Sequence, residues 1–369
     1  MSQPAKVLII DDSAVARQTL KNILSEDPEL EVVGTAPDAL IALKKISELN
    51  PDVLTLDVQM PKMDGLTFLE RLMKSRPMPV VMVSSYTQEG SETAMRSLEL
   101  GAVDIIEKPK FEVREGLNEI AILITDKVKA AAQAKMKTAR QIFMQASPKQ
   151  STEVVLPKTT GKRKTTDQEP LIAIGASTGG TEVLREILSS LPPNLPGIVI
   201  VQHMPKAFTG SFANSLDRVS ELEIKEAEDG DMVESGKALL APGDAHMILK
   251  TSGSSYQAQL DTGELVNRHR PAVDVLFRSV ASIAGSAAVG VILTGMGNDG
   301  AKGMTEMHDQ GALTLAQDQE SCVVYGMPKV AVESGAVDES LTPEPVSYTH
   351  LRAHETPEHR VCRLMLEKK

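Results

Sequence analysis

The first third of the chain alternates short apolar runs with longer, helix-like segments. The apolar runs are rich in Val and Ile and are mostly uninterrupted by polar residues: Lys6–Ile10, Val53–Leu56, Pro79–Val83 and Asp104–Ile106. Such runs are typical of parallel strands that are covered on both faces. The segments between them include Ser13–Ser25 and Leu66–Ser75, which have helical patterns. We therefore expect residues 6 to about 122 to form a doubly wound α/β sheet.

The same alternation resumes at Leu171 and continues to about Leu341, without an internal repeat. The expected strands are Leu171–Ile174, Gly197–Val201, Lys237–Leu240 and Val289–Leu293. The expected helices are Thr181–Ser190, Val273–Ala281 and Ala301–Asp309. This pattern predicts a second α/β unit.

Residues 125–168 separate the two units and have a different composition. A helical pattern continues over Lys127–Arg140 and then disappears, and the segment holds ten Lys or Arg against three Asp or Glu. We interpret it as a solvated interdomain linker. A basic patch for nucleic acid or an acidic membrane is the alternative, but no aromatic residues interleave the charges.

The tail from about Pro345 fits neither pattern. It contains the string SYTHLRAHET, which resembles the translated read-through of a sequencing adaptor, so we expect residues 345–369 to be foreign. His350 and His354 are spaced to share one helix face, as a zinc site requires, and His359 follows them. We favour the foreign tail over the zinc site.

Composition narrows the class of protein. A chain of 369 residues suits two domains, and 41% hydrophobic with 24% charged residues is typical of a globular protein. A net charge of −11, 3% aromatic residues and no Trp argue against nucleic-acid binding. Cys322 and Cys362 are not spaced for a metal knuckle or a redox pair. The first ten residues are too short for a signal peptide, and no apolar run approaches about 18 residues. We therefore expect a cytoplasmic protein without membrane insertion.

Three carboxylates follow the expected strands of the first unit. Asp11 and Asp12 come directly after Lys6–Ile10, and Asp57 ends the apolar block at Val53–Leu56. In a doubly wound sheet, the carboxyl ends of strands meet in one crevice. Because three clustered carboxylates repel one another, a hard divalent cation with oxygen ligands is the expected relief. The pattern therefore predicts a Mg²⁺ site that is open to a phosphate donor.

Two further residues suit a phosphorylated carboxylate: Ser84 offers a hydroxyl and Lys108 a positive charge. The strings DDSAVAR, LDVQMPKMDG, SSY and EKP together resemble the receiver domains of bacterial two-component systems. The resemblance implies that Asp57 is the phospho-acceptor, that Asp11 and Asp12 hold Mg²⁺ with it, and that Ser84 and Lys108 read out the phosphate. It also implies a histidine kinase as phosphodonor. Receivers usually carry Tyr or Phe three residues before the lysine, where this chain has Ile105.

In the second unit, Leu171–Ile174 runs directly into GASTGGTE and a helical pattern. A Gly-rich turn between strand and helix can bind a phosphate at the helix N-terminus. The same turn, read as G-x-S-x-G, can expose Ser177 as a nucleophile. His203 ends the next strand, where a dinucleotide site would have Asp or Glu, and imidazole is a good general base. Asp299, in the turn after Val289–Leu293, is the candidate for orienting the imidazole.

The order Ser177, His203, Asp299 differs from that of α/β-hydrolases, in which the acid precedes the histidine. With GASTGG, VQHMP and TGMGNDG, it resembles the catalytic domain of the CheB family of chemotaxis protein-glutamate methylesterases. The resemblance implies hydrolysis of glutamate γ-methyl esters on methyl-accepting chemotaxis receptors, often with deamidation of receptor glutamines. The resemblance also places Thr178 and Met296 at the site and implies that the esterase step needs no cofactor.

Together the two resemblances imply two doubly wound parallel-sheet domains joined by a linker. These are a flavodoxin-like receiver at 5–124, a linker at 125–168 and a Rossmann-like catalytic domain at 169–342. Three alternatives remain: a receiver joined to a non-catalytic docking module, a transcriptional regulator and a nucleotide-dependent oxidoreductase. The α/β alternation of residues 169–341 disfavours the regulator, which requires a helix-turn-helix with a basic recognition helix.

Overall fold

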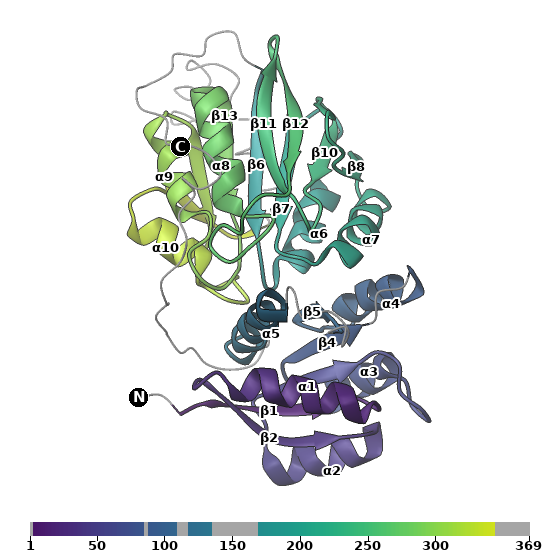
Figure 1. Ribbon diagram of the computed structural model, residues 1–369. Helices are drawn as coiled ribbons and strands as arrows, with labels where there is room; N and C mark the ends of the chain where they lie inside the picture. The colour runs from purple at the N-terminus through teal and green to yellow at the C-terminus, as the bar shows by residue number, and fades with distance from the viewer. Residues whose placement is uncertain (1–2, 85–87, 109–116, 135–168, 344–369) are drawn as a thin grey trace, which may run out of the picture. The chain divides into compact units, whose positions relative to one another are not determined.

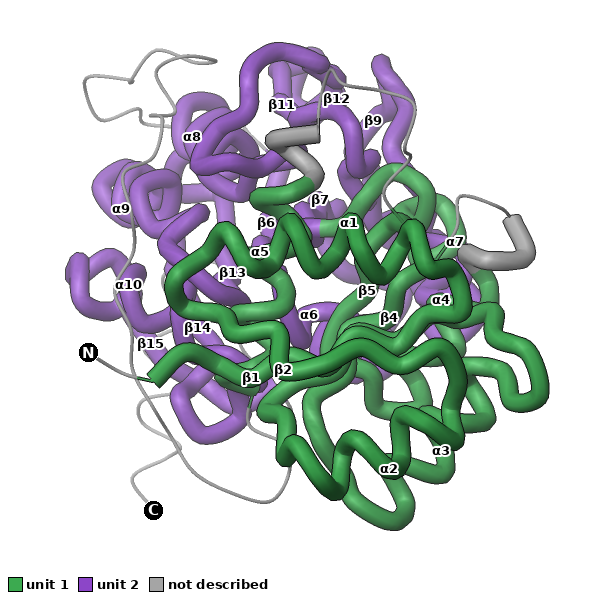
Figure 2. The backbone as a smooth tube through the Cα atoms, turned by 60° about the horizontal axis from the view of Figure 1, so that its bottom comes forward, with its two compact units in different colours: residues 1–148, 204–212 green, residues 149–203, 213–369 purple. Residues whose placement is uncertain are grey.

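The computed structural model describes residues 3–84, 88–108, 117–134 and 169–343 (Figure 1). The chain divides into two compact units (Figure 2). One contains residues 1–148 and 204–212, and the other contains residues 149–203 and 213–369. No helix among the described residues is long and apolar enough to cross a membrane.

The first unit is built on a five-stranded parallel sheet in the order β2-β1-β3-β4-β5. Its strands are β1 (Ala5–Ile10), β2 (Leu30–Ala36), β3 (Val53–Asp57), β4 (Val80–Ser84) and β5 (Asp104–Glu107). Its helices are α1 (Ala14–Ser25), α2 (Ala39–Leu49), α3 (Gly65–Ser75), α4 (Gln88–Glu99) and α5 (Leu117–Ala132). Every residue of β3 and β4 is buried, as expected for central strands covered on both faces. The predicted doubly wound sheet is confirmed.

Side-chain caps fix where three of these helices begin. Ser13, Asp38 and Asp64 each accept a hydrogen bond from the backbone N–H three residues later, at 3.3, 2.9 and 2.9 Å. Such a bond satisfies one of the free N–H groups of the first turn. The caps therefore fix the starts of α1 and α3, which follow the strands β1 and β3 that lead into the acidic residues, and of α2, which follows β2.

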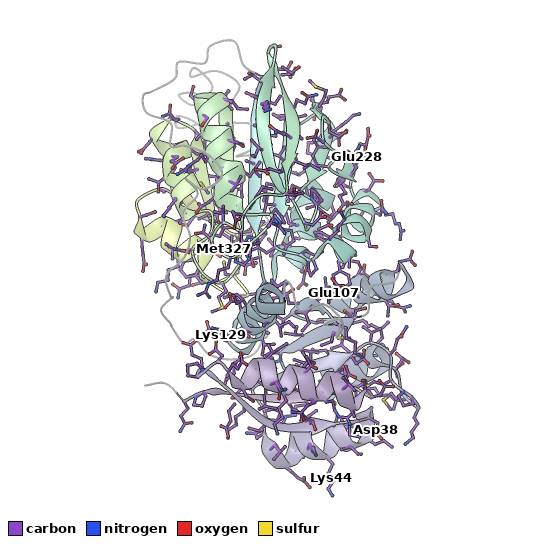
Figure 3. The ribbon with its side chains drawn as sticks, in the orientation of Figure 1. Asp38, Lys44, Glu107, Lys129, Glu228 and Met327 are labelled. Atoms are coloured by element: carbon purple, nitrogen blue, oxygen red, sulfur yellow. The ribbon has the colours of Figure 1, made fainter. Side chains whose placement is uncertain are left out.

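Helix α5 extends into the segment that we assigned to the linker. Residues 125–132 are helical, and two of their lysines pair with acidic residues of the first unit. Lys127 forms an ion pair with Asp104, and Lys129 Nζ lies 2.8 Å from Asp27 Oδ2. Figure 3 labels Lys129 on this helix. The remainder of the expected linker, from residue 135, lies outside the described residues.

The second unit contains a seven-stranded parallel sheet in the order β15-β14-β13-β6-β7-β10-β8. These strands are β6 (Leu171–Ala176), β7 (Gly197–Gln202), β8 (Glu223–Glu226), β10 (Lys237–Leu240), β13 (Ala288–Ile292), β14 (Leu313–Gln317) and β15 (Glu339–Leu341). A separate antiparallel sheet contains β9 (Met232–Val233), β11 (His246–Ser252) and β12 (Ser255–Asp261). The sequence predicted the central parallel strands and missed the antiparallel sheet.

Strand β6 lies between β7 and β13: the chain continues from β6 to β7 on one side, and the later strand β13 pairs with β6 on the other. This is the topological switch point at which doubly wound sheets bind ligands. The helices are α6 (Gly180–Ser190), α7 (Lys206–Asp217), α8 (Val273–Ile283), α9 (Ala301–Asp309) and α10 (Met327–Glu333). Helix α8 packs against β6, β7 and β13. The fold therefore brings the carboxyl ends of these three strands and the N-terminus of α8 to one edge.

Candidate active site and phosphorylation site

The turn after β6 holds Ser177 at the N-terminus of α6. The backbone N–H of Gly180 donates to the carbonyl oxygen of Ser177 at 2.8 Å, which closes the turn. Gly179 has a left-handed φ of +79°, and a Cβ there would lie 2.5 Å from the Val323 Cβ. A Cβ at Gly180 would lie 2.4 Å from the Gln202 side-chain oxygen. Both glycines are therefore required for the close packing of this turn.

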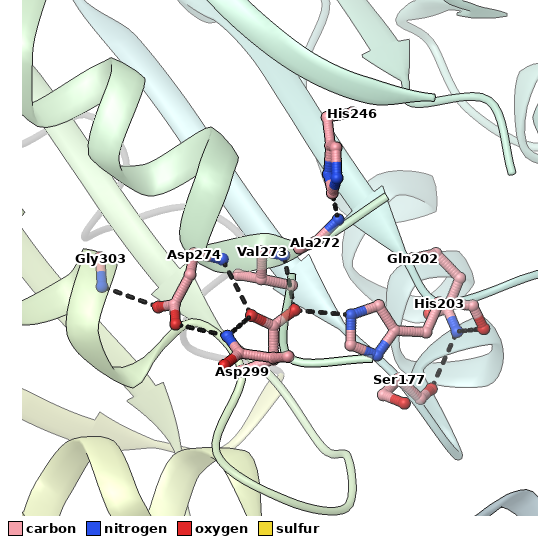
Figure 4. Close-up of polar contacts among 10 residues, drawn as sticks. Ser177, Gln202, His203, His246, Ala272, Val273, Asp274, Asp299 and Gly303 are labelled. Atoms are coloured by element: carbon pink, nitrogen blue, oxygen red, sulfur yellow. Dashed lines mark hydrogen bonds and ion pairs between the residues drawn. The ribbon is translucent and has the colours of Figure 1, made fainter. Parts of the chain in front are cut away.

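Backbone pairing brings Ser177 and His203 to the same edge of the sheet. Ala176 and Gln202 are register partners at the ends of β6 and β7, and Ser177 and His203 each follow directly. The His203 N–H donates to the Ala176 carbonyl at 3.0 Å. The Gln202 amide donates to the Ser177 carbonyl at 2.9 Å (Figure 4). On the other side, the Ser177 N–H donates to the Thr294 carbonyl beyond β13 at 3.0 Å. Three strand ends therefore converge on the serine.

Asp299 lies in the turn between β13 and α9 and is 1% exposed. Its Oδ2 is 2.8 Å from His203 Nε2 (Figure 4). Burial works to raise the pKa of Asp299, but the hydrogen bond and charge of His203 and the charge of His269 hold it below its usual range. An ionised Asp299 can only accept this bond, so His203 carries its proton on Nε2. Nδ1 is then the basic nitrogen of the ring.

The other two expected site residues lie at the same edge. Thr178 follows Ser177, is buried, and accepts a hydrogen bond from the Thr294 hydroxyl on its carbonyl oxygen at 3.1 Å. Met296 lies in the turn after β13 and is half-buried. Thr178 and Met296 thus flank Ser177 on two different turns.

Sequence reasoning missed three residues that surround the His203–Asp299 pair. His269 stacks on His203, with ring centroids 3.8 Å apart and an interplanar angle of 16°. Asn267 donates hydrogen bonds to Asp299 and to Asp274, both at 2.7 Å. An Asn in VNRHR is a turn signal that the sequence did offer. Its contact with Asp299, 32 residues away, left no sequence signal.

In the first unit, Asp11, Asp12 and Asp57 form a carboxylate cluster. One oxygen of each lies within 4.8 Å of the others, with Asp11 and Asp57 buried and Asp12 exposed. Lys108 Nζ lies 2.9 Å from Oδ2 of both Asp57 and Asp11. Ser84, at the end of β4 next to β3, is buried. The structure therefore brings all five expected residues to the carboxyl edge of this sheet.

Burial and charge make the cluster suitable for a cation. Burial raises the pKa of Asp57, and the neighbouring charge of Asp11 raises it further. Burial works to lower the pKa of Lys108, yet its bonds to Asp57 and Asp11 raise it. Asp11 Oδ2 is a buried carboxylate oxygen that lies 2.9 Å from Lys108 Nζ, its charged partner. Three carboxylates with such an oxygen fit a hard cation such as Mg²⁺.

The candidate zinc residues His350 and His354, like His359 and the rest of the expected foreign tail, lie outside the described residues.

Comparison with known families matches both units. The family model "CheB methylesterase" matches residues 172–349, and "Response regulator receiver domain" matches residues 7–121. Both resemblances drawn from the sequence are thereby confirmed.

Individual relatives match over nearly the whole chain. A protein-glutamate methylesterase/protein-glutamine glutaminase of Thiobacillus denitrificans is 54% identical over 90% of this chain and 92% of its own. A protein-glutamate methylesterase/protein-glutamine glutaminase of Oleidesulfovibrio alaskensis is 51% identical over 92% of this chain and 95% of its own. The crystal structure of the Thermotoga maritima CheB methylesterase catalytic domain is 43% identical, covers 50% of this chain and 99% of its own, and has a TM-score of 0.49. Because relatives of 51% and 54% identity match over at least 90% of its length, the chain belongs to the CheB family of protein-glutamate methylesterases/protein-glutamine glutaminases.

Proposed function

We propose that this chain is a phosphorylation-activated serine esterase. It hydrolyses glutamate γ-methyl esters on methyl-accepting chemotaxis receptors, releases methanol, and deamidates receptor glutamines by the same route. The observation that carries the proposal is the buried His203–Asp299 hydrogen bond beside Ser177 at the switch point of the sheet. The printed names of the relatives include both activities.

The first half of the reaction is acyl transfer to Ser177. The serine Oγ attacks the ester carbonyl carbon while His203 Nδ1 takes the hydroxyl proton. His203 then returns this proton to the methoxy oxygen, the C–O bond breaks, and methanol leaves. Asp299 stabilises the imidazolium that exists between these two transfers, because it accepts the Nε2–H bond.

The second half regenerates the serine. His203 Nδ1 takes a proton from water as the water oxygen attacks the acyl carbon, and the proton then returns to the Ser177 Oγ. The product is a free γ-carboxylate. With a receptor glutamine as substrate, ammonia takes the place of methanol as the first leaving group and the second half is the same.

The negative charge on the substrate oxygen requires donors that are already in place. One oxyanion donor contributes about 3–4 kcal/mol to the transition state. We propose that the backbone N–H of Met296 and those of the turn at Thr178 serve here. The N-terminus of α6, which begins at Gly180, adds a favourable dipole.

The receiver unit supplies the control. Asp57 accepts a phosphoryl group from the phosphohistidine of a chemotaxis histidine kinase, with Lys108 and Ser84 contacting the phosphoryl oxygens. Asp11, Asp12 and Asp57 would hold Mg²⁺, which neutralises charge on the incoming phosphoryl group. The chain exists in a less active and a more active state. Phosphorylation of Asp57 raises the esterase activity because it stabilises the more active state and so shifts the population toward it. Since kinase and receptor tails meet in the cytoplasm, we place the reaction there.

Methanol release tests this proposal. Methylated receptor membranes are incubated with the intact chain, with and without acetyl phosphate and Mg²⁺, and with the variant D57N as control. We expect release by both proteins, with stimulation by acetyl phosphate for the intact chain alone. No release in any condition would refute the esterase, and equal stimulation of D57N would refute Asp57 as the switch.

A further inference from the structure

The residues that directly precede helices α8 and α9 provide no side-chain cap. Instead, an acidic residue from the turn before α9 caps α8, and an acidic residue of α8 caps α9. Ala272 precedes α8 and Gly300 precedes α9, and neither makes a side-chain cap. Asp299, one residue before Gly300, accepts the N–H groups of Val273 and Asp274 at 2.7 and 3.2 Å. Asp274 in turn accepts the Gly303 N–H of α9 at 2.8 Å (Figure 4). The exchange locks the two helix N-termini together.

This exchange places two buried carboxylates side by side, where they repel. The Asn267 amide nitrogen lies 2.7 Å from Asp274 Oδ2 and 2.7 Å from Asp299 Oδ1, so it donates one hydrogen to each. All three side chains are buried. A neutral group with two N–H donors is suited to this position, because it satisfies both carboxylates without adding charge.

The backbone around Asn267 is a tight turn that suits this role. Asn267 and Arg268 have φ values of +52° and +70°. Val266 and His269 exchange backbone hydrogen bonds at 3.1 and 2.9 Å, which makes a two-residue hairpin of the type that favours Asn at its first position. The tip of the hairpin thus reaches Asp299, and its end carries His269, which stacks on His203.

His246 fixes both ends of the segment 264–272 that contains this hairpin. Its Nδ1 accepts the Ala272 N–H at 3.1 Å, and its Nε2 donates to the Glu264 carbonyl at 2.9 Å. Burial lowers the pKa of His246, which favours the neutral ring that this bonding pattern requires. The segment is therefore anchored independently of Asp299.

We propose that Asn267 is a positioning residue for the esterase reaction, with Asp274 as its second anchor. Its amide holds the Asp299 carboxylate so that Oδ2 faces His203 Nε2. The inference rests on the proposed function, since it concerns the same site. Without the amide, Asp299 keeps the bonds from the Val273 and Asp274 N–H groups at 2.7 and 3.2 Å, but Oδ1 loses its shorter bond, so the carboxylate is held less firmly toward His203.

The variant N267G tests this because glycine keeps the left-handed turn and removes the amide. The matched control is N50G, since Asn50 also has a positive φ, of +49°, and lies after α2 in the other unit. N267D serves as a second variant, because Asp tolerates the turn and replaces both N–H donors with oxygens. Circular dichroism establishes which variants fold.

Two readouts separate positioning from general stability. For N267G we expect kcat for methanol release to fall on the order of 10- to 100-fold with KM unchanged. The acid limb of its pH profile moves to lower pH, because the Asp299 carboxylate is no longer held facing Nε2 and stabilises the charged imidazole less. In NMR without substrate, we expect the His203 Nε2 proton to exchange faster with water in N267G and in N267D. We expect N50G to match the intact chain in both readouts.

The NMR measurement decides the inference even if the chain proves not to be an esterase. If the His203 Nε2 proton exchanges with water at the same rate in a folded Asn267 variant as in the intact chain, the inference is wrong. A fall in kcat with the acid limb unmoved would also overturn it, because Asn267 would then have only a structural role. Absence of methanol release from the intact chain would overturn the proposed function instead.

Discussion

Replacing Asp299 by asparagine changes one oxygen to an amide nitrogen and leaves the size of the side chain unchanged. Each oxygen of Asp299 accepts two hydrogen bonds. Oδ2 accepts from His203 and Val273, and Oδ1 accepts from Asn267 and Asp274. If the amide nitrogen takes the place of Oδ1, the Asn267 amide and the Asp274 N–H lose their acceptor, and if it takes the place of Oδ2, the Val273 N–H loses its acceptor. If the amide nitrogen faces His203, it donates to Nε2 and forces the ring proton onto Nδ1, which can then no longer accept the proton of Ser177.

The magnitude follows from the tautomer. The same inversion in the Ser-His-Asp triad of serine proteases lowers kcat about 10⁴-fold, which corresponds to about 5.4 kcal/mol at about 1.36 kcal/mol per tenfold change. Each donor that loses its acceptor also costs about 1–3 kcal/mol of stability. Removal of a buried charge offsets part of this cost. We therefore expect D299N to fold and to be nearly inactive.

The assay is methanol release at saturating receptor substrate, with thermal unfolding of each variant measured in parallel. D309N is the matched control, because Asp309 is exposed at the other end of α9. We expect D309N to retain full activity. A folded D299N with kcat within about tenfold of the intact chain would refute the role given to Asp299, since tautomer inversion costs far more.

Three further predictions concern stability and the receiver. Burial and the charge of Asp299 raise the pKa of Asp274 from 3.8 to about 7, so between these pH values the folded chain binds more protons than the unfolded chain and stability falls as pH rises. D274N should flatten this dependence in urea titrations across that range, and an unchanged slope would contradict the assignment. G303A should lower the free energy of unfolding by about 1–3 kcal/mol, because its Cβ would lie 2.6 Å from the Phe277 Cβ and 3.0 Å from the Asp274 carbonyl; thermal unfolding at least as stable as the intact chain would contradict this packing. D12N should raise the Mg²⁺ concentration needed for phosphorylation by acetyl phosphate, since exposed Asp12 is one of three oxygen donors, and an unchanged Mg²⁺ titration would exclude it as a ligand.

Patterns of apolar residues were sufficient to predict the two parallel sheets. The central strands β3, β6 and β7 are fully buried, so their sequences are mostly apolar, with Thr55 the single polar residue before the strand ends. Parallel strands then imply that residues after each strand meet at one edge. This implication placed Ser177 and His203 correctly, because each directly follows its strand.

Elements without such a pattern were missed. Strand β15 is mostly exposed and β9 is two residues long, so neither has an apolar signature. The helical pattern expected from Lys127 onward is present as far as Ala132, the end of α5, but its ion pairs of Lys127 with Asp104 and of Lys129 with Asp27 were not foreseen. The pattern of charge along a sequence does not reveal such partners.

The surroundings of Asp299 were missed for a different reason. Asn267 lies in a loop between the antiparallel sheet and α8, and the position of that loop depends on how those elements pack. Asp274 lies in the first turn of α8, where an acidic residue is a common stabilising feature and carries no signal of a further partner. Its bond to Gly303 depends on the packing of α8 against α9.

The central claim is that Ser177 is the nucleophile. The most direct test is methanol release from methylated receptor membranes by S177A and by S189A, where Ser189 is exposed in the last turn of α6. Removing the Ser177 hydroxyl removes the atom that forms the acyl-enzyme, whereas Ser189 donates only to the Glu186 carbonyl. We expect S189A to match the intact chain and S177A to release no methanol above background. Release by a folded S177A at the rate of the intact chain would contradict the account.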